Sequence, residues 1–223
     1  MIKTDDIKSV GLVCVGSELF SHIVNSNIHI ANRVLETNGF ELKCNISVHD
    51  DSDGIKSAIR FCLQNSDAVI VSGGLGPTFD DITREAVSEL TGRNLVFSQD
   101  AWNEILEKFA QRKIVEIPDR NKKQAMVLEG AKKISNSIGT APGMLVDYEG
   151  KSIFLLPGPP TEFKEMLIKD VIPELLSRSS SQREKLVSRG FGIAGESEAF
   201  VEEKTARLRQ EISFLGGKWT SLA

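Results

Sequence analysis

Apolar runs and apolar stripes alternate along the first ninety residues. Residues 9–15 (SVGLVCV) and 68–71 (AVIV) are short, valine-rich apolar runs of the kind found in buried strands. Residues 28–38, 55–63 and 82–90 instead place apolar side chains at helical spacing, and residues 40–48 partly alternate. This repeated strand and helix order predicts an α/β fold of three layers, a mainly parallel sheet with helices on both faces.

The second half of the chain adds a helix, a hairpin and a tail. Residues 98–111 carry a helical stripe, and residues 119–127 predict another short helix. Residues 144–148 and 152–156 predict a hairpin around Glu149-Gly150-Lys151, followed by a helix over 162–176 that is interrupted around Pro173.

The serine-rich stretch 177–183 predicts a linker between two domains. We therefore expect a main domain over residues 1–176 and a small α+β appendage over 184–223, with a strand at 185–193 and a helix at 196–208. The appendage can be a truncated piece of a larger domain.

Composition and charge narrow the classes of protein and partner. The chain has 223 residues and a formal net charge of −4, which gives no general attraction for nucleic acid. Local basic patches are still possible at Lys122-Lys123 and Lys132-Lys133. No apolar run approaches membrane-spanning length and no secretory signal begins the chain, so we expect a cytoplasmic protein with no membrane partner. Its three cysteines are expected to be reduced.

The strongest chemical signal is GGLGPTFDDIT, residues 73–83, between a predicted buried strand and a predicted helix. Glycines there let the main chain approach a ligand, and amides at a helix start point toward anions. The candidate phosphate-binding residues of this loop are Gly73, Gly74, Gly76, Pro77 and Thr78. A P-loop lysine, a G-x-G-x-x-G fingerprint and a G-x-S-x-G elbow are all absent from the sequence.

The carboxylates of Asp80 and Asp81 would repel a phosphate unless a cation lies between the carboxylates and the phosphate. The pair suits magnesium, which takes one or two carboxylates with phosphate oxygens and water. The alternative is that one aspartate caps the following helix while the other interacts with its dipole.

Two further loops are expected at the same sheet edge, because parallel strands direct their carboxyl ends to one side. In the first, Ser17 can donate to phosphate and Glu18 can act as a base or orient water, although either can also cap a helix. Asn25 and Asn27 add amide donors near this loop. The third loop, Pro157, Gly158, Pro159 and Pro160, is preorganised by its prolines and is otherwise an ordinary strand-to-helix turn.

Together these blocks resemble the competence/damage-inducible CinA family, within the molybdopterin-binding group that includes MoaB and MogA. The matching blocks appear in order as VGSEL (15–19), IVNSN (23–27), SGGLGPTFDDIT (72–83), NKKQAMVLEGA (121–131), NSIGTAPG (136–143), LPGPPTEFKEM (156–166) and FGIAGESE (191–198).

The resemblance implies a MoaB/MogA-like fold, a homo-oligomer such as a dimer or trimer, and a nucleotide or pterin ligand over the glycine loop. It also implies hydrolysis of the pyrophosphate of ADP-ribose or a similar compound, assisted by Mg, Mn or Co. Asp80 and Asp81 would then be metal or catalytic groups and Glu18 a supporting carboxylate, with Asn136, Gly139, Thr140 and the third loop lining the site.

The first loop, GSELFSHI, departs from the family by one missing residue and a missing second glycine. A pterin or nucleotide-binding module without turnover is therefore an alternative function. A second alternative is an activity like that of the molybdopterin adenylyltransferases.

Overall fold

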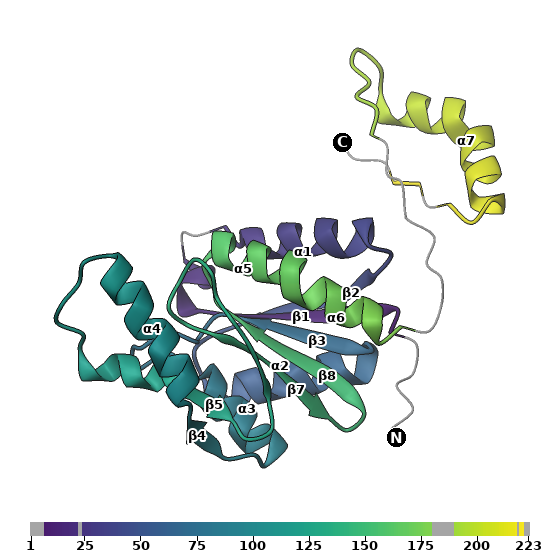
Figure 1. The fold of residues 1–223 in the computed structure, drawn as a ribbon. Helices are drawn as coiled ribbons and strands as arrows, with labels where there is room; N and C mark the ends of the chain where they lie inside the picture. The colour runs from purple at the N-terminus through teal and green to yellow at the C-terminus, as the bar shows by residue number, and fades with distance from the viewer. Residues whose placement is uncertain (1–6, 22–23, 180–189, 218, 221–223) are drawn as a thin grey trace. The chain divides into compact units, whose positions relative to one another are not determined.

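The computed structural model describes residues 7–21, 24–179, 190–217 and 219–220. The chain divides into two compact units, Met1–Leu186 and Val187–Ala223, each considered by itself. The first unit is built on one large sheet (Figure 1). Its strands are β1 (Ser9–Val15), β2 (Glu41–Val48), β3 (Ala68–Ser72), β6 (Lys132–Ile134), β7 (Gly143–Tyr148) and β8 (Lys151–Leu156).

The strands lie in the order β2-β1-β3-β8-β7-β6. The first four in this order are mutually parallel, whereas β7 and β6 pair antiparallel. In the register, Ser72 of β3 lies between Cys14 of β1 and Leu156 of β8. The carboxyl ends of three neighbouring strands therefore meet at one edge, where α/β sheets bind their ligands.

Helices cover both faces of this sheet, as predicted (Figure 1). On one face lie α1 (Ser26–Thr37), α5 (Pro160–Met166), the π-helical turn η3 (Leu167–Val171) and α6 (Ile172–Ser177); on the other lie α2 (Ser52–Asn65) and α3 (Thr83–Thr91). The alternation of a strand divides its side chains between the two layers, so Leu12 of β1 joins the first core and Val13 the second. The three-layer α/β fold is confirmed.

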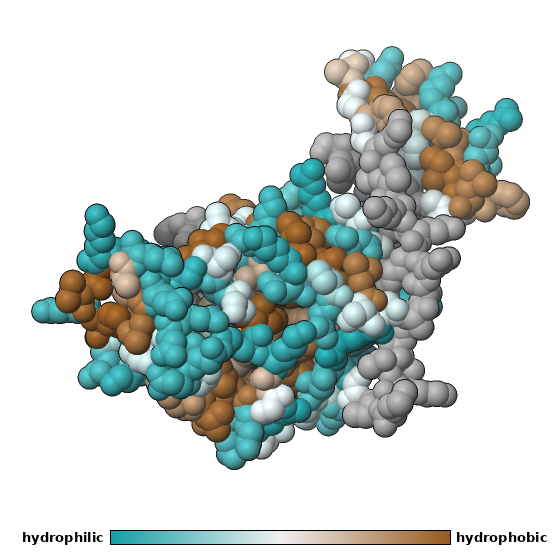
Figure 2. Space-filling view, viewed as in Figure 1, coloured by the Kyte–Doolittle hydropathy of each residue, from teal (hydrophilic) through white to brown (hydrophobic). Residues whose placement is uncertain are grey.

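A smaller substructure lies beside the sheet. It contains β4 (Leu95–Phe97) and β5 (Met126–Leu128), which pair antiparallel, together with α4 (Gln99–Gln111) and the 3₁₀ helix η2 (Asp119–Ala125). The Ser98 hydroxyl caps α4 by accepting from the Ala101 amide. Figure 2 shows a mainly hydrophilic visible face on which apolar side chains form several patches. Val115, in the segment that follows α4, is 92% exposed.

Two local predictions need correction here. The helix predicted over 119–127 is a 3₁₀ helix that ends at Ala125, because Met126 begins β5. The helix predicted over 162–176 is interrupted not at Pro173 itself but in the preceding π turn. Proline lacks an amide hydrogen and clashes with the carbonyl four residues earlier, so the helical hydrogen bonds must rearrange before it.

The predicted β-hairpin is confirmed. The two central turn residues are Glu149 and Gly150, with φ of 49° and 79°. These are the positive φ angles that a tight two-residue hairpin requires.

The second unit contains α7 (Glu198–Phe214), capped by the Ser197 hydroxyl, so the helix predicted over 196–208 is confirmed and continues further. Of the predicted strand 185–193, residues 185–189 lie outside the described residues, and 190–193 form no strand. Most of the predicted linker also lies outside them. Within the described part of the chain, no helix is long and apolar enough to span a membrane.

Candidate functional site

Three loops meet where β1, β3 and β8 end. We call them the first loop (residues 16–21), the glycine loop (73–82) and the proline loop (157–159). The Gly73 amide donates to the Leu156 carbonyl over 3.0 Å. A Cβ on Gly73 would lie 2.1 Å from the Val15 carbonyl oxygen, and its φ is +104°, so only glycine fits between these strands. The prediction that the three loops share one sheet edge is met by this geometry.

Asn27, at the start of α1, ties two of these loops together. Its buried Nδ2 donates to the Ser72 hydroxyl over 2.9 Å and to the Gly158 carbonyl over 2.7 Å, and Ser72 in turn donates to the Pro157 carbonyl over 3.2 Å. Both Nδ2 hydrogens are thereby used inside the protein. Asn27 therefore orients the proline loop, while its Oδ1 has no donor among the described residues.

The tip of the glycine loop is organised around Thr78. Asp81 accepts from the Thr78 amide over 2.8 Å and from the Thr78 hydroxyl over 2.5 Å, and Asp80 also lies within hydrogen-bond reach of that hydroxyl. One hydroxyl has one hydrogen and cannot donate to both carboxylates at once. The two negative groups thus converge on a single donor. Gly76 makes room for this, since a Cβ there would lie 2.4 Å from Asp81 Oδ2.

The helix-capping alternative for the two aspartates is not what the structure shows. The N-cap of α3 is Ile82, and no side chain accepts a hydrogen bond from the first amides of this helix. Asp81 bonds back to Thr78 instead. The start of α3 is therefore left without a side-chain acceptor, and such a helix end favours an anion.

Asp80 is exposed and fully able to carry charge. The hydrogen bond from the Thr78 hydroxyl holds the pKa of the Asp80 carboxyl below its ordinary value, with a smaller favourable contribution from the charge of Lys123. A carboxylate with a lowered pKa is a weak proton acceptor. Asp80 therefore suits charge stabilisation or cation binding better than general-base catalysis.

Two positively charged side chains contact this loop. The sequence of the loop did not predict either contact. Lys123, one of the local basic residues, donates to the Thr78 carbonyl over 3.2 Å and forms an ion pair of 3.3 Å with Glu85. Arg84 is buried beneath the loop and donates to the Leu75 carbonyl over 2.6 Å. An arginine in a helical sequence pattern is normally exposed, so its burial had no sequence signal.

The first loop is more exposed than the glycine loop. The Ser17 amide donates to the Asp50 carboxylate over 2.8 Å, and the Phe20 and His49 rings stack with centroids 4.0 Å apart. Ser17 and Glu18 are exposed. Asn25 donates over 3.3 Å to Ser47 at the end of β2, away from the other two loops.

Asn136 and its neighbours form a support next to the proline loop. The buried Asn136 side chain accepts from the Ile138 and Gly139 amides and donates to Ala141 and to the Glu162 carboxylate. A Cβ on Gly139 would lie 2.2 Å from that carboxylate. Asn136 and Gly139 thus determine the backbone conformation of residues 136–141. Thr140, in the same segment, is half-buried. Pro159 and Pro160, at the start of α5, are exposed.

Of the candidate metal ligands, only the carboxylates of Asp80 and Asp81 lie close enough together to bind a divalent cation. Among the described residues, no group of three or more His, Cys, Asp or Glu side chains is placed to hold a metal ion, so Glu18 does not complete a cluster with Asp80 and Asp81. The paired carboxylates alone fit a magnesium-like ion that keeps water and takes its remaining ligands from phosphate.

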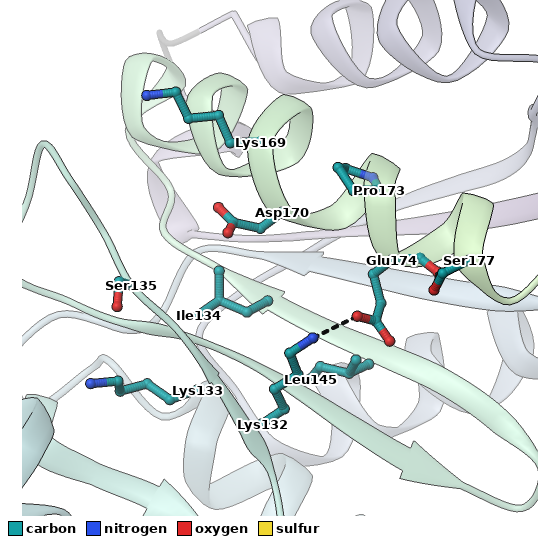
Figure 3. A pocket seen from close by; sticks show the side chains of 10 residues that line it. All are labelled: Lys132, Lys133, Ile134, Ser135, Leu145, Lys169, Asp170, Pro173, Glu174 and Ser177. Atoms are coloured by element: carbon teal, nitrogen blue, oxygen red, sulfur yellow. Dashed lines mark hydrogen bonds and ion pairs between the residues drawn. The ribbon is translucent and has the colours of Figure 1, made fainter.

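A separate groove of about 420 Å³ lies between β6 and the helical segment η3–α6 (Figure 3). None of the predicted site residues lines it. Its lysines are already paired: Lys132 with Glu174, Lys133 with Asp100 and Glu104, and Lys169 with Glu165. Figure 3 shows Lys132 reaching across the groove to Glu174. The groove thus offers no unpaired lysine for a phosphate.

Comparisons with known proteins identify the family to which the chain belongs. The family described as probable molybdopterin binding domain matches residues 11–177. A CinA structure from Thermoplasma acidophilum, titled as having unknown function, aligns with a TM-score of 0.70 at 33% identity, covering 77% of this chain and 99% of that one. The chain belongs to the CinA family and carries its molybdopterin-binding domain.

Other relatives of this CinA-family chain support the same family assignment. It is 40% identical over 198 residues to a putative competence-damage inducible protein of Caldicellulosiruptor saccharolyticus, covering 88% of this chain and 47% of that protein. A Bacillus subtilis protein of the same description is 40% identical over 195 residues, with 86% and 46% covered. The chain thus spans about half the length of these curated relatives. MoaB from Thermus thermophilus, at 18% identity, 78% and 99% coverage and a TM-score of 0.50, shares the fold.

Proposed function

We propose that this chain binds the phosphates of a nucleoside diphosphate compound on the glycine loop and hydrolyses the phosphoanhydride with the aid of a divalent metal. ADP-ribose is the substrate we would test first. The observation that carries the proposal is the convergence of Asp80 and Asp81 on the Thr78 hydroxyl, beside a helix start that no side chain caps. This places two anions where a phosphate is also favoured, so a cation is needed to join them.

The chain's own residues would divide the work. The glycine loop and the first turn of α3 would hold phosphate oxygens through backbone amides. Asp80 and Asp81 would hold the divalent cation, which when bound would neutralise phosphate charge and polarise the bond to be broken. Glu18, exposed in the first loop, is the candidate to orient or deprotonate the attacking water.

Phe79 supports a ligand that carries an aromatic ring. It lies between Thr78 and Asp80 at the tip of the loop and is 93% exposed. An exposed aromatic side chain beside a phosphate site is suited to stack on a nucleobase or a pterin.

The test is release of AMP and ribose 5-phosphate from ADP-ribose with magnesium, manganese or cobalt, against a chelated control. We expect Asp81→Asn to lower this turnover by on the order of a hundredfold or more, as loss of a group acting in the transition state does. Asp51→Asn is the matched control, because Asp51 caps α2 by accepting from the Gly54 amide and lies outside the loops. Equal activity of Asp81→Asn and wild type would reject the metal site.

A binding module without turnover is the second candidate, supported by the altered first loop and by the absence, among the described residues, of a metal-binding cluster in which Glu18 joins Asp80 and Asp81. Its prediction is a rise in melting temperature with nucleotides or molybdopterin but no product from any of them. Folded protein that no member of such a panel stabilises would rule out this second function.

A further inference from the structure

Arg84 is the one arginine without exposed surface in the described part of the chain, at 0% exposure. It is the second residue of α3 and lies directly under the glycine loop, where Nη2 donates to the Leu75 carbonyl. The proposed function did not use it. Burying a guanidinium removes it from water, and such a charge is normally matched by a carboxylate or another anion.

Within the described residues, no carboxylate forms a hydrogen-bonded ion pair with Arg84. Its Nε and Nη1 have no hydrogen-bond partner, and it forms no ion pair there. Burial lowers the pKa of Arg84 to about 10, while the negative charges of Glu85 and Asp81 act in the opposite direction. The guanidinium is therefore held charged at neutral pH with only one of its donors satisfied.

Its position on the helix adds to the imbalance. The first turn of α3 carries the positive end of the helix dipole, where a cation is unfavourable and an anion is favourable. The same turn has no side-chain cap. Two sources of positive potential, the guanidinium and the helix end, are thus stacked beneath a loop whose glycines allow close approach of a ligand.

We propose that Arg84 is a positioning residue for the phosphate group: its buried charge fixes the glycine-loop backbone at Leu75 and is balanced when a phosphate occupies the loop. The inference rests on the proposed phosphate site. It adds that affinity for the phosphate depends on a buried positive charge that the ligand does not touch.

Three substitutions separate charge, hydrogen bond and volume. Arg84→Met keeps most of the volume, Arg84→Gln keeps a donor for the Leu75 carbonyl without the charge, and Arg84→Lys keeps the charge. Arg93→Met is the matched control, because Arg93 lies just beyond α3 and bonds the Glu129 and Asp147 carbonyls, away from the loop. All but Arg84→Lys change the net charge equally.

The measurement is calorimetric titration with inorganic pyrophosphate and with ADP, paired with melting temperatures with and without each ligand. We expect Arg84→Met and Arg84→Gln to bind roughly tenfold more weakly, as loss of a nearby buried charge implies. Arg84→Lys should recover most of the affinity, and Arg93→Met should change it less than about twofold because surface charges are screened. Without ligand, Arg84→Met should melt no lower than wild type.

The outcomes are distinguishable. If wild type binds neither probe, both the phosphate site and this role of Arg84 are rejected. If wild type binds but Arg84→Gln binds equally well, only the role of Arg84 is rejected. Should Arg84→Met fail to fold, the comparison of Arg84→Gln with Arg84→Lys decides alone: loss with Gln and recovery with Lys supports the role of the charge, and equal affinities overturn it.

Discussion

The glycine loop and the first loop both follow a buried parallel strand and begin with glycine, yet they are held in different ways. The glycine loop is fixed from beneath: the Thr83 hydroxyl donates to the Gly73 carbonyl over 2.8 Å, and the Arg84 guanidinium bonds the Leu75 carbonyl. The first loop is held from the surface, by Asp50 and by the stacked rings of Phe20 and His49. The glycine loop, where phosphate would bind, is thus the more rigidly held of the two. The first loop beside it is held less tightly.

This difference has a functional meaning. A loop whose backbone is set by buried contacts can present amides in a fixed geometry, which reduces the entropy lost on binding. A loop held by exposed contacts can change in sequence at a low cost in stability. That is consistent with the first loop being the one that departs from the family's pattern, while GGLGPT is retained.

The comparison would be broken most directly by substituting the two glycines. Gly73→Ala should lower the free energy of unfolding by about 2 to 4 kcal/mol, since backbone strain at positive φ adds to overpacking. The added methyl group would meet the Val15 carbonyl oxygen, which is backbone and cannot move aside. Denaturation in urea measures the change.

Gly16→Ala is the counterpart in the first loop. Its methyl group would meet the Glu18 carboxylate, the end of an exposed side chain that can rotate away. Gly16 also has a positive φ of 158°, which adds backbone strain, so we expect a loss of about 1 to 2 kcal/mol, smaller than at Gly73 because no backbone atom blocks the methyl group. Equal losses for the two variants would show that the loops are equally constrained and would remove the contrast.

A smaller effect should separate the two asparagines at the start of α1. Asn27→Ala removes a buried side chain that bonds both Ser72 and Gly158, and it should cost about 1 to 3 kcal/mol because two buried acceptors lose their donor. Asn25→Ala removes a half-buried bond of 3.3 Å to Ser47 and a weak interaction with the Cys14 thiol, and it should cost less than about 1 kcal/mol. Urea denaturation compares them, and the reverse order would contradict the assignment of Asn27 to the loop support.

The smallest effect concerns the charge at the loop tip. Because the folded-state pKa of Asp80 is lowered, its contribution to stability is complete at neutral pH and is lost as pH falls through that lowered value. Thr78→Val removes the hydroxyl that causes the shift, so the Asp80 titration followed by NMR should move up toward the ordinary aspartate range. An unchanged midpoint would show that the hydroxyl does not set the pKa.

The sheet and its site were predictable to different depths. β1 and β3 are continuous apolar runs, and the αL conformation of Gly92 and the Glu149-Gly150 turn follow from residue type, so these elements could be predicted locally. By contrast, β4, β5 and β6 have three residues each, too few for a period to be recognised.

At the candidate site, GGLGPTFDDIT predicted a loop that the structure places at the carboxyl ends of the parallel strands, but local pattern could not predict the residues that support it. The burial of Arg84, the contact of Lys123 with Thr78 and the bond between Asn136 and Glu162 depend on segments distant in sequence. The capping hypothesis was reasonable for aspartates before a helix. It failed because Asp81 finds nearer donors in Thr78.

The hydrogen bond from Asn27 to Gly158 joins residues 131 apart in the chain. Loop closure over such a separation is slow and opposed by entropy, so contacts of this kind form late in folding. During synthesis from the N-terminus, the glycine loop is made long before β8 and the proline loop exist to close it. Ligand-binding competence should therefore appear only when the C-terminal part of the sheet has been added, which makes binding a direct report of completed folding.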